Sequence, residues 1–483
     1  MSRFIGRERD IAALNALLQR QEAQLVLVDG RRRSGKTTLL LEWAKQSGRE
    51  KIYWVAARDV AAQLRQGLMA EVWSWAYPGS GETPKLAFDT WQGVFDTIAR
   101  MIDDKPVILI LDEFSYAAES DHSLASYLQA AWDHQFKEHK NLIVALAGSH
   151  IGMMSSLMQE QAPLYGRVTA HLRVEPLPFA AVRGFLPQYP TADRVAVWAV
   201  VGGIPAYLER FSGDRTVADN LRELFMQRTG MFRAEPLVLV GDVIGRNRET
   251  YEAVLRAIAA GRRTPTEIGQ ALKQTAGYLG PYLKNLSDLH LIERRLPVTV
   301  PLERHGTSRS GRYHLSDPYL RFFFRFIAPN MNLVEQQLDV LLWERIREQF
   351  RSYVGEAFED LCQEWVLAQA RENNLPFMPE LVGSHWAPDA QVDVVAINHG
   401  EKSILLGECK WGTGGVGRAE VRELVEKAAL VVPGADWKVS YVLFSRYGFT
   451  DAAQAEATGV QAQLVDLDRI DADLMAAQNK ELA

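Results

Sequence analysis

Residues 30–37 read Gly30-Arg31-Arg32-Arg33-Ser34-Gly35-Lys36-Thr37 and follow the apolar run Leu25-Val26-Leu27-Val28. The segment is a complete G-x-x-x-x-G-K-[ST] match, with a short buried strand expected before it and a helix opening at Thr38 after it. The two glycines let the backbone wrap a phosphate chain, so that successive N–H groups and the helix N-terminus face the anion. This stretch therefore predicts a site for a nucleoside triphosphate.

The side chains of this loop have distinct expected roles. Lys36 adds a positive charge for the outer phosphates, and the Thr37 hydroxyl can ligate Mg²⁺. We expect the remaining nucleotide contacts of the loop from Gly30, Arg33, Ser34, Gly35 and Thr38. A surface loop rich in glycine and arginine is the alternative, and the flanking strand and helix count against it.

A second apolar run, residues 107–111, ends in Asp112 and Glu113. Five consecutive apolar residues suit a central strand that helices cover on both faces. Asp112 then emerges at the carboxyl end of the strand, where α/β folds place ligands, and can hold Mg²⁺ through water. Glu113 would polarise the attacking water, which favours hydrolysis over binding alone. An ordinary buried strand that ends in a solvated acidic pair is the alternative.

Length and composition indicate a globular protein of about three domains. Hydrophobic residues make up 47% of the 483 residues and charged residues 24%. Lys and Arg number 54 against 60 Asp and Glu, so a net charge of −6 excludes a global basic field and leaves only local patches for nucleic acid. The two cysteines suit a reducing compartment and exclude a disulfide scaffold or a cysteine-based zinc site. Without an apolar signal core or membrane-length run, we expect a cytoplasmic protein that makes no membrane contact.

The first 175 residues alternate helix and strand as an open parallel sheet should. We expect strands at 25–29, 52–56, 107–111, 142–147 and near 171–175. A helical insertion between the second and third strands contains three tryptophans that we interpret as core residues: Trp73, Trp75 and Trp91. The fourth strand ends in Gly148-Ser149-His150, which places a polar side chain beside the γ-phosphate position.

Residues 246–316 are typical of a winged helix. We expect helices at 251–260, from Thr264 with Pro265 in its first turn, and at 277–289, followed by β segments at 291–300 and 312–315. The third helix and wing region, with the turn before them, are basic, with Lys273, Lys284, Arg294, Arg295, Arg304, Arg309 and Arg312. They predict contact with duplex phosphates through a recognition helix and its flanks. A winged helix that docks protein or another domain is the alternative.

Residues 391–397 and 403–411 predict a β-hairpin whose turn is 398–401. Glu408 and Lys410 are two residues apart and share one face of the strand, while Cys409 points away. Asp393 precedes the turn by a distance similar to that by which Glu408 follows it, so the two carboxylates should come close.

Three charged groups on one face of an apolar hairpin are costly without a function. Asp393 and Glu408 can hold Mg²⁺, or Mn²⁺, which activates water, while Lys410 orients the nucleophile. An ion-paired surface edge strand is the alternative.

Several motifs together resemble the archaeal-type AAA+/STAND-related P-loop ATPases. They are Phe4-Ile5-Gly6-Arg7-Glu8, the loop at 30–38, Ile110-Leu111-Asp112-Glu113-Phe114, Ala147-Gly148-Ser149-His150, Leu164-Tyr165-Gly166-Arg167 and the Gly202-Gly203-Ile204-Pro205-Ala206-Tyr207-Leu208 turn.

That resemblance covers residues 1 to about 245. It implies that Ile5, Gly6 and Arg7 lie near the adenine and that Ser149 or His150 senses the γ-phosphate. Arg167 is then either a trans-acting arginine or a surface residue paired within its own domain. The lid offers no convincing second sensor arginine.

The D…E-x-K pattern resembles the restriction-endonuclease-like PD-(D/E)xK nucleases. The preceding helix Gly355-Glu356-Ala357-Phe358-Glu359 resembles that of archaeal Holliday-junction resolvases, which implies that Glu359 is a fourth member of the site. The tail from Tyr313 to Trp411 resembles the domain of unknown function DUF234, which accompanies these ATPases.

The expected fold is an α/β multidomain chain in five parts. They are a P-loop αβα core (1–175), a helical lid (176–245), a winged helix (246–316), a helical linker (317–350) and a restriction-endonuclease-like domain (351–470).

Two functions follow from this organisation. The first is an ATP-hydrolysing, DNA-associated protein, active as a homo-oligomer, in which nucleotide state controls a metal-dependent nuclease-like domain. The second is an ATPase switch or scaffold whose nuclease-like domain is inactive and serves for binding or regulation. Both require ATP and Mg²⁺, and only the first requires a metal ion, Mg²⁺ or Mn²⁺, in the nuclease-like domain.

Overall fold

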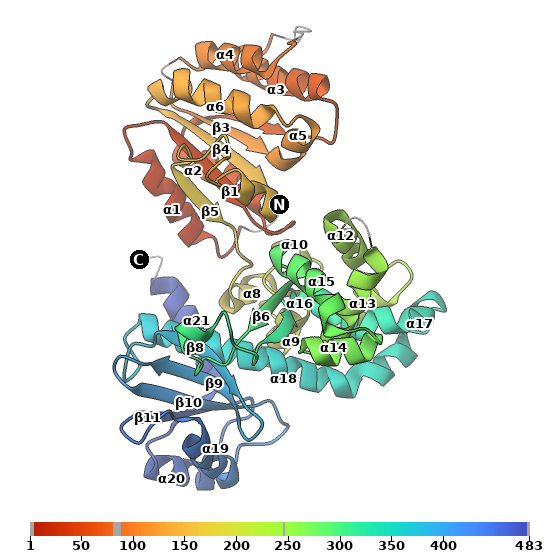
Figure 1. The fold of residues 1–483 in the computed structure, drawn as a ribbon, viewed down its shortest axis with the longest axis vertical. Coiled ribbons are helices and arrows are strands. Elements are labelled where there is room, and N and C mark those ends of the chain that lie inside the picture. Colours follow the sequence, from red (N-terminus) through yellow and green to blue (C-terminus); the bar gives the residue numbers. More distant parts are fainter. Residues whose placement is uncertain (1–3, 81–87, 104, 245–246, 481–483) are drawn as a thin grey trace. The chain divides into compact units, whose positions relative to one another are not determined.

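The computed structural model describes residues 4–80, 88–103, 105–244 and 247–480. The chain divides into two compact units (Figure 1). The first unit contains Met1–Leu177 and Ile204–Tyr207, and the second contains Pro178–Gly203 and Leu208–Ala483.

A five-stranded, wholly parallel sheet forms the centre of the first unit. Its strands, in spatial order, are β2 (Glu50–Val55), β3 (Val107–Asp112), β4 (Leu142–Gly148), β1 (Gln24–Asp29) and β5 (Ala170–Arg173). The predicted parallel sheet is confirmed. Parallel pairing brings the carboxyl ends of β1, β3 and β4 to one edge, where the loop after β1 and the acids after β3 lie.

Alternate residues of β3 bury against helices on opposite faces of this sheet. Ile108 and Ile110 pack with α1 (Glu8–Leu18) and α2 (Lys36–Ser47). Leu109 and Leu111 pack on the other face. The helices there are α3 (Ala61–Ala76), α4 (Trp91–Ile102), α5 (Phe114–Ser120) and α6 (Leu124–His134). An uninterrupted apolar strand is stable here because both of its faces are covered.

The second unit begins with α8 (Phe179–Phe185), α9 (Thr191–Val201), α11 (Val217–Leu221) and α12 (Glu235–Ile244). Most of the segment 176–245, which we expected as a lid, therefore groups with the carboxyl-terminal part of the chain. Only Ile204–Tyr207, most of α10 (Pro205–Leu208), groups with the first unit.

Three helices and a two-stranded antiparallel sheet follow, and we call residues 247–316 the three-helix module. Its elements are α13 (Arg248–Ala259), α14 (Pro265–Leu272), α15 (Ala276–Asp288), β6 (Ile292–Arg295) and β7 (Arg312–Leu315). Thr264 and Glu267 form a capping box at the start of α14, and Pro265 lies in its first turn as predicted.

The first strand of this module is shorter than the expected 291–300. Pro297 has no N–H to pair, and the Val298 N–H bonds the carbonyl of Ser384 at 3.1 Å instead.

One long helix, α18 (Asp339–Arg371), replaces the predicted linker helix and the separate helix expected from Gly355. The expected boundary between residues 350 and 351 lies inside this helix. Gly355 does not interrupt it because Phe350, Tyr353 and Phe358 continue one buried face.

The carboxyl-terminal sheet is mixed, with β8, β9 and β10 antiparallel and β10, β11 and β12 parallel. In spatial order its strands are β12 (Gln463–Asp466), β11 (Lys438–Ser445), β10 (Ser403–Lys410), β9 (Gln391–Asn398) and β8 (Leu381–Trp386). The predicted hairpin is confirmed as β9 and β10.

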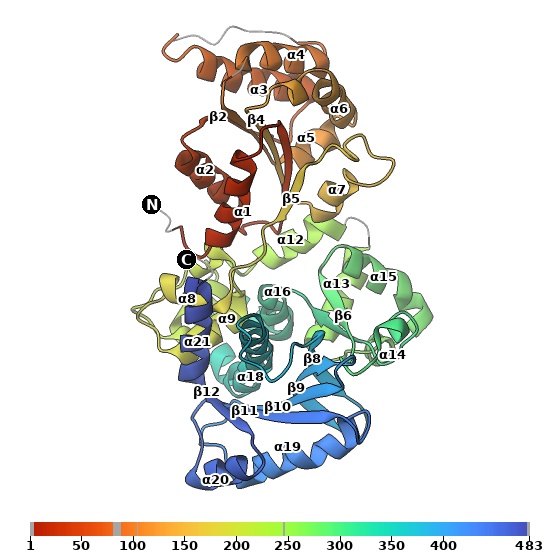
Figure 2. The ribbon, with the colours of Figure 1, turned by 90° about the vertical axis from the view of Figure 1, so that its left-hand side faces the viewer.

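Helices cover both faces of this sheet: α18 on one, and α19 (Arg418–Val431) with α20 (Asp451–Gly459) on the other (Figure 2). Trp365 of α18 contacts Phe444, with 5.5 Å between ring centroids, while the adjacent Leu443 belongs to the core beneath α19. The last helix, α21 (Leu467–Lys480), extends past the expected domain end at residue 470.

None of the helices in the described residues has the length and apolar composition that crossing a membrane requires.

Candidate functional site

The loop between β1 and α2 has a backbone that requires glycine at two positions. Gly30 has φ 151°, and an added Cβ would lie 2.5 Å from the carbonyl oxygen of Val174. Gly35 has φ 92° directly before α2. Arg7 fixes the loop from outside, because its buried Nη2 donates to the Ser34 carbonyl at 2.6 Å.

Lys36 is 5% exposed and forms no ion pair with any carboxylate of the described residues. Its Nζ donates to the backbone carbonyls of Gly30 at 3.0 Å and Arg31 at 2.9 Å. Burial lowers the pKa of Lys36 to about 8, although the nearby carboxylates oppose this shift. Ser34 Oγ is buried and has no hydrogen-bond partner among the described residues. A buried ammonium that has only backbone carbonyl acceptors, next to a buried hydroxyl without a partner, suits a phosphate chain.

Asp112 lies at the end of β3 within reach of Thr37, as predicted. Thr37 Oγ1 donates to Asp112 Oδ2 at 2.5 Å, and the Tyr53 hydroxyl lies 3.3 Å from the same oxygen. Burial raises the pKa of Tyr53 to about 12, so its phenol remains a donor. A hydroxyl and a carboxylate in contact are the hard oxygen ligands that Mg²⁺ prefers in nucleotide sites.

Glu113 adopts a left-handed conformation, φ 50° and ψ 37°, which is rare for this residue type. Its Oε1 accepts a hydrogen bond from Ser149 Oγ at 3.0 Å, so the two residues expected near the γ-phosphate are in contact. Its Oε2 is buried without a partner among the described residues. Backbone strain concentrates at functional sites, and a carboxylate oxygen left unpaired can accept a proton from water.

The other residues predicted for this site differ in their surroundings. Ile5 and Gly6 are partly buried next to Arg7, and Thr38 is exposed. Arg167 pairs with Asp133 inside the same unit, at 2.7 Å from Nη2 to Oδ2.

His150 Nδ1 accepts a hydrogen bond from the Met153 N–H at 3.1 Å and so caps the helix that follows it. This contact leaves Ser149 as the polar residue that faces Glu113.

Sequence reasoning missed a buried ion pair directly before the loop. Asp29 is fully buried and accepts from Arg173 Nε at 3.1 Å, and His171 Nε2 lies 3.2 Å from its other oxygen. Asp29 ends an apolar strand just as Asp112 does, and that pattern would have identified it. Its partners come from β5, which no local pattern indicates.

The 204–207 segment also lies beside the loop. The Arg33 guanidinium is 5.7 Å from the ring centroid of Tyr207, and Pro205 Cγ is 3.9 Å from the position of a Cβ on Gly35. Residues 202–208 were recognised in the sequence as a motif, but the sequence did not indicate that they would lie beside the loop.

The second predicted site, on β9 and β10, brings its carboxylates and lysine together. The register pairs Val394 with Gly407, which makes Asp393 and Glu408 neighbours at the next position. Asp393 Oδ2 accepts from the Cys409 N–H at 3.0 Å, and Lys410 Nζ donates to Glu408 Oε1 at 2.9 Å. Asp393 and Glu408 are 9% and 8% exposed.

A second ammonium, absent from the sequence prediction, occupies the other oxygen of Glu408. Lys427 Nζ, from α19, donates to Glu408 Oε2 at 2.8 Å. The described residues contain no group of three His, Cys, Asp or Glu side chains arranged to hold a metal ion. Side-chain metal ligands at this site would therefore be Asp393 and Glu408 alone.

Asp393 and Glu359 form no ion pair with any lysine or arginine of the described residues. Burial and the charge of Glu408 raise the pKa of Asp393 to about 6. Burial and the charge of Asp393 raise the pKa of Glu359, on α18, to about 9. The charge of Asp393 thus acts on Glu359, and the role of Glu359 as a fourth member of the site stays a prediction. An added cation would relieve both shifts.

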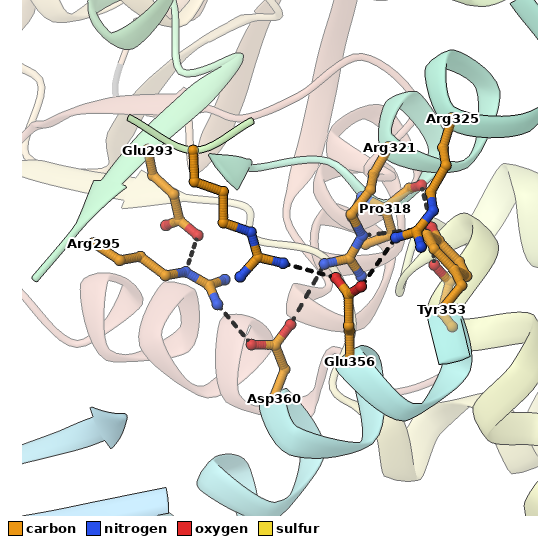
Figure 3. Close-up of polar contacts among 10 residues, drawn as sticks. Glu293, Arg295, Pro318, Arg321, Arg325, Tyr353, Glu356 and Asp360 are labelled. Atoms are coloured by element: carbon orange, nitrogen blue, oxygen red, sulfur yellow. Dashed lines mark hydrogen bonds and ion pairs between the residues drawn. The ribbon is translucent and has the colours of Figure 1, made fainter. Parts of the chain in front are cut away.

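Arginines of the three-helix module, of α16 (Pro318–Phe322) and of the helical turn that follows it (Phe323–Ile327) pair with acids of α18 (Figure 3). Arg295 and Arg321 lie 2.8 Å and 3.7 Å from the two oxygens of Asp360. Glu356 pairs with Arg263 at 2.9 Å and with Arg325 at 3.0 Å. We call these contacts the arginine seam.

The segment between β6 and β7, expected as a DNA-binding wing, contacts β8. Thr299 Oγ1 is 2.7 Å from His385 Nδ1, and Trp386 Nε1 donates to the Ser310 carbonyl at 2.9 Å. Of the seven basic residues predicted for DNA, Arg295 joins the seam and Arg312 stacks on Trp386 at 4.9 Å. The exposed members are Lys273, Lys284, Arg294, Arg304 and Arg309.

Two family models match the chain. Residues 4–211 match an ATPase domain found predominantly in Archaea. Residues 323–424 match DUF234, described as archaeal and bacterial proteins of unknown function. The first match contains every predicted residue of the nucleotide site, and the second contains Glu359, Asp393, Glu408 and Lys410 but not Lys427.

An uncharacterised protein of Methanocaldococcus jannaschii is 30% identical over 409 residues, which span 84% of this chain and 87% of that protein. Among solved structures, a Walker-type ATPase of Pyrococcus abyssi is 19% identical, with a TM-score of 0.48 over 66% of this chain and 96% of its own. The ORC2 protein of Aeropyrum pernix is 15% identical, with a TM-score of 0.42 over 69% of this chain and 94% of its own.

Proposed function

This chain belongs to the family of its archaeal relative, with an ATPase domain found predominantly in Archaea followed by DUF234, and we propose that it hydrolyses ATP in its first unit. We further propose that the nucleotide state controls a metal-dependent nuclease-like site in the second unit. The observation that carries the ATPase proposal is the contact of Thr37 with Asp112 and of Ser149 with Glu113 beside the buried Lys36.

Each residue of the nucleotide site has a role in this proposal. The loop N–H groups and Lys36 bind the phosphate oxygens. Lys36 gives up its hydrogen bonds to the Gly30 and Arg31 carbonyls and donates to the phosphate instead. Thr37 and Asp112 would hold Mg²⁺, which supplies charge neutralisation for the leaving phosphate. Glu113 accepts the proton of the attacking water, and Ser149 orients its carboxylate.

Glu113→Gln tests this assignment because it removes the base and keeps the shape. We expect a variant that binds ATP as tightly as wild type and hydrolyses it at least about 100-fold more slowly. Equilibrium titration of ATP and measurement of phosphate release separate the two effects. If Glu113→Gln hydrolyses ATP at the wild-type rate, the proposed mechanism is wrong.

In the second unit, Asp393 and Glu408 would hold Mg²⁺ or Mn²⁺, which supplies a more acidic water for attack on a phosphodiester. Lys410 orients the nucleophile, and Glu359 completes the acidic side of the site. The raised pKa values of Asp393 and Glu359 support this proposal, because they mark carboxyl groups that lack a cation.

The proposal that nucleotide binding controls the nuclease-like site rests on the way the chain passes between the two units. The chain leaves the first unit after Leu177, returns to it for Ile204–Tyr207 and leaves it again. This short segment directly follows α9, whose Ala199 carbonyl accepts a hydrogen bond from Tyr353 of α18 at 2.8 Å. A shift of Ile204–Tyr207 on nucleotide binding is thereby transmitted to the helix that carries Glu359.

A supercoiled plasmid and branched DNA are suitable substrates for testing control. Cleavage would be measured with Mn²⁺ in the presence of ATP, ADP or no nucleotide, using Glu113→Gln to hold the ATP state. We expect the cleavage rate to depend on nucleotide. Equal rates in all three conditions would refute control, and absence of cleavage by every preparation would refute the nuclease.

The alternative function, an ATPase switch with an inactive nuclease-like domain, is favoured by one observation. Lys427 occupies the second oxygen of Glu408 and so competes with a metal ion. Under this alternative, nucleotide changes the oligomeric state or partner binding while no DNA is cut. Sedimentation with ATP and ADP tests it.

DNA binding and self-assembly remain part of the proposal. The exposed Lys273, Arg304 and Arg309 would contact duplex phosphates if the three-helix module acts as a winged helix. In a homo-oligomer, Arg167 would leave Asp133 to reach the nucleotide of a neighbouring copy.

A further inference from the structure

A cavity of about 50 Å³ lies in the second unit where the three-helix module, α16, α18 and β8 meet. Its walls carry mostly charged and imidazole side chains. They include Arg263, Arg295, Arg312, Arg321, His314 and His385, opposite Glu356, Glu359 and Asp360.

The lining of this cavity contains more guanidinium groups than carboxyl groups, and Glu293, outside the lining, also pairs with Arg295. The carboxylates of Glu356 and Asp360 serve the arginine seam. Arg312 makes no ion pair with a carboxylate in the described part of the chain; the charge of Glu267 acts on it from a greater distance, and its guanidinium lies 4.9 Å from the ring centroid of Trp386. Four guanidinium groups therefore line the cavity with three carboxyl groups, and Glu356 and Asp360 are each shared between two arginines; this excess of guanidinium groups favours an anion.

Two imidazole nitrogens in the walls also lack partners. His314 Nε2 and His385 Nε2 are buried and make no hydrogen bond to any residue that the structure describes. His385 is 9% exposed, and its other nitrogen is already engaged by Thr299. Burial and the surrounding arginines lower the pKa of His314 to about 2, so its ring is neutral. Unpaired buried polar atoms are costly, and a ligand rich in oxygen would satisfy them.

The size of the cavity limits the ligand. One water needs about 10–15 Å³ of such space, so the cavity takes a group of about four atoms of that size. A tetrahedral oxyanion such as phosphate fits this limit, whereas a nucleobase exceeds it. Bidentate guanidinium contacts are also the geometry that phosphate oxygens prefer.

We propose that this cavity binds the 5′-terminal phosphate group of the nucleic acid on which the neighbouring Asp393–Glu408 site acts. The cavity and that site share a wall, because Gln363 lines the cavity and its Nε2 donates to the Asp393 carbonyl at 3.1 Å. Glu359 lines the cavity as well and interacts electrostatically with Asp393. The source of the phosphate rests on the proposed function, while the chemistry of the cavity does not.

The test uses the full chain with Lys36→Ala, which removes phosphate binding at the nucleotide loop. Inorganic phosphate is titrated calorimetrically into this Lys36→Ala parent and into three double variants that add Arg312→Gln, Arg312→Lys or Arg351→Gln to it. Arg351 is an exposed arginine of α18 outside the cavity and serves as the matched control. We expect Arg312→Gln to weaken binding about tenfold or more, Arg312→Lys to retain part of it, and Arg351→Gln to leave it unchanged.

A second arm identifies the source of the phosphate. Identical oligonucleotides with a 5′-phosphate or a 5′-hydroxyl are titrated in the absence of divalent metal, so that none is cut. We expect tighter binding of the phosphorylated strand, and loss of that difference in Arg312→Gln.

The outcomes separate this proposal from the nuclease proposal. If the Lys36→Ala parent binds no phosphate, or Arg312→Gln binds it as tightly as the parent, the cavity is not a phosphate site. If phosphate binds but the 5′-phosphate gives no advantage that depends on Arg312, the nucleic-acid assignment is wrong. Arg312-dependent binding in a protein that cuts no DNA supports the cavity and refutes only the nuclease.

Discussion

The nucleotide loop and the β9–β10 hairpin differ in the sign of their unpaired groups: the loop has a buried ammonium, and the hairpin has buried carboxyl groups. At the loop, buried Lys36 has only backbone acceptors, and burial lowers its pKa to about 8. At the hairpin, burial and the charge of Glu408 raise the pKa of Asp393 to about 6, and burial and the charge of Asp393 raise the pKa of Glu359 to about 9. The first site therefore needs an anion and the second needs a cation, which are the charges of a phosphate chain and of a divalent metal.

The two sites also differ in how their acids are satisfied. Asp112 accepts from Thr37 and from the Glu113 N–H, so its contacts need little rearrangement when a nucleotide binds. Glu408 already holds two ammonium groups, from Lys410 and Lys427. A metal at the hairpin must displace at least one of them, whereas Lys36 at the loop must give up only hydrogen bonds to backbone carbonyls. The ATPase proposal is consequently the stronger of the two.

The largest effect is expected at the loop. Lys36→Ala removes the charge that faces the outer phosphates, and we expect ATP hydrolysis to fall by about 100-fold or more. Phosphate release at saturating ATP is the measurement. Lys45→Ala is the matched control, because Lys45 is an exposed lysine of the same helix, with its side chain 76% exposed. If both variants hydrolyse ATP equally, ATP hydrolysis does not depend on the charge of Lys36. The proposed difference between the loop, which needs an anion, and the hairpin, which needs a cation, would then be wrong.

The next effect separates the two lysines on Glu408. Lys410→Ala should lower DNA cleavage about 100-fold, since it removes the group that orients the nucleophile. Lys427→Ala should preserve cleavage and lower the metal concentration needed for half-maximal rate, since it frees Oε2 of Glu408. Rates measured across a Mn²⁺ titration distinguish these outcomes. A reversal, with Lys427 essential and Lys410 dispensable, would show that the E-x-K pattern misidentified the working lysine.

A smaller effect concerns stability at high pH. The pKa of Glu359 is raised to about 9 from its ordinary 4.5, so between these values the folded protein holds a proton that the unfolded chain has lost. The free energy of unfolding contributed by this group therefore falls as pH rises through that window. Glu359→Gln should raise the unfolding midpoint by about 2–4 °C near pH 8 and by less near pH 5.

Thermal unfolding of both proteins at pH 5, 6.5 and 8 checks this expectation. The Glu22→Gln variant provides the control, because Glu22 is an exposed acid of the first unit. A stability difference that does not grow with pH would mean that Glu359 is ionised in the folded protein. Its pKa would then no longer indicate that the hairpin site needs a cation.

The smallest effect is expected in the arginine seam. Arg295 and Asp360 are partly exposed, so their coupling should be about 0.5–1 kcal/mol in a double-mutant cycle of Arg295→Gln and Asp360→Asn. Denaturant unfolding of the four proteins yields this value. Additive effects would show that the pair contributes nothing to holding the three-helix module on α18.

The sequence predicted the elements whose signals are local. The glycines of the loop, the apolar run of β3 and the alternation of Glu408, Cys409 and Lys410 each depend on residues within one element. Even the proximity of Asp393 and Glu408 follows from counting residues on either side of one turn. Patterns of this kind predict structure because strand alternation and hairpin register are set by the chain itself.

Other features depended on residues far apart in the chain. No pattern indicated that α18 would continue through Gly355, that Lys427 would reach Glu408 or that β5 would supply Arg173 to Asp29. The expected wing looked basic and free, yet its segment contacts β8.

The amino-acid order by itself thus determined a phosphate loop, its acidic partners and a carboxylate hairpin, because their geometry follows from short-range backbone rules. Only the tertiary structure decided which of these charges are neutralised and which remain unpaired. That outcome depends on burial and on partners brought together by packing, and both are properties of the folded chain as a whole.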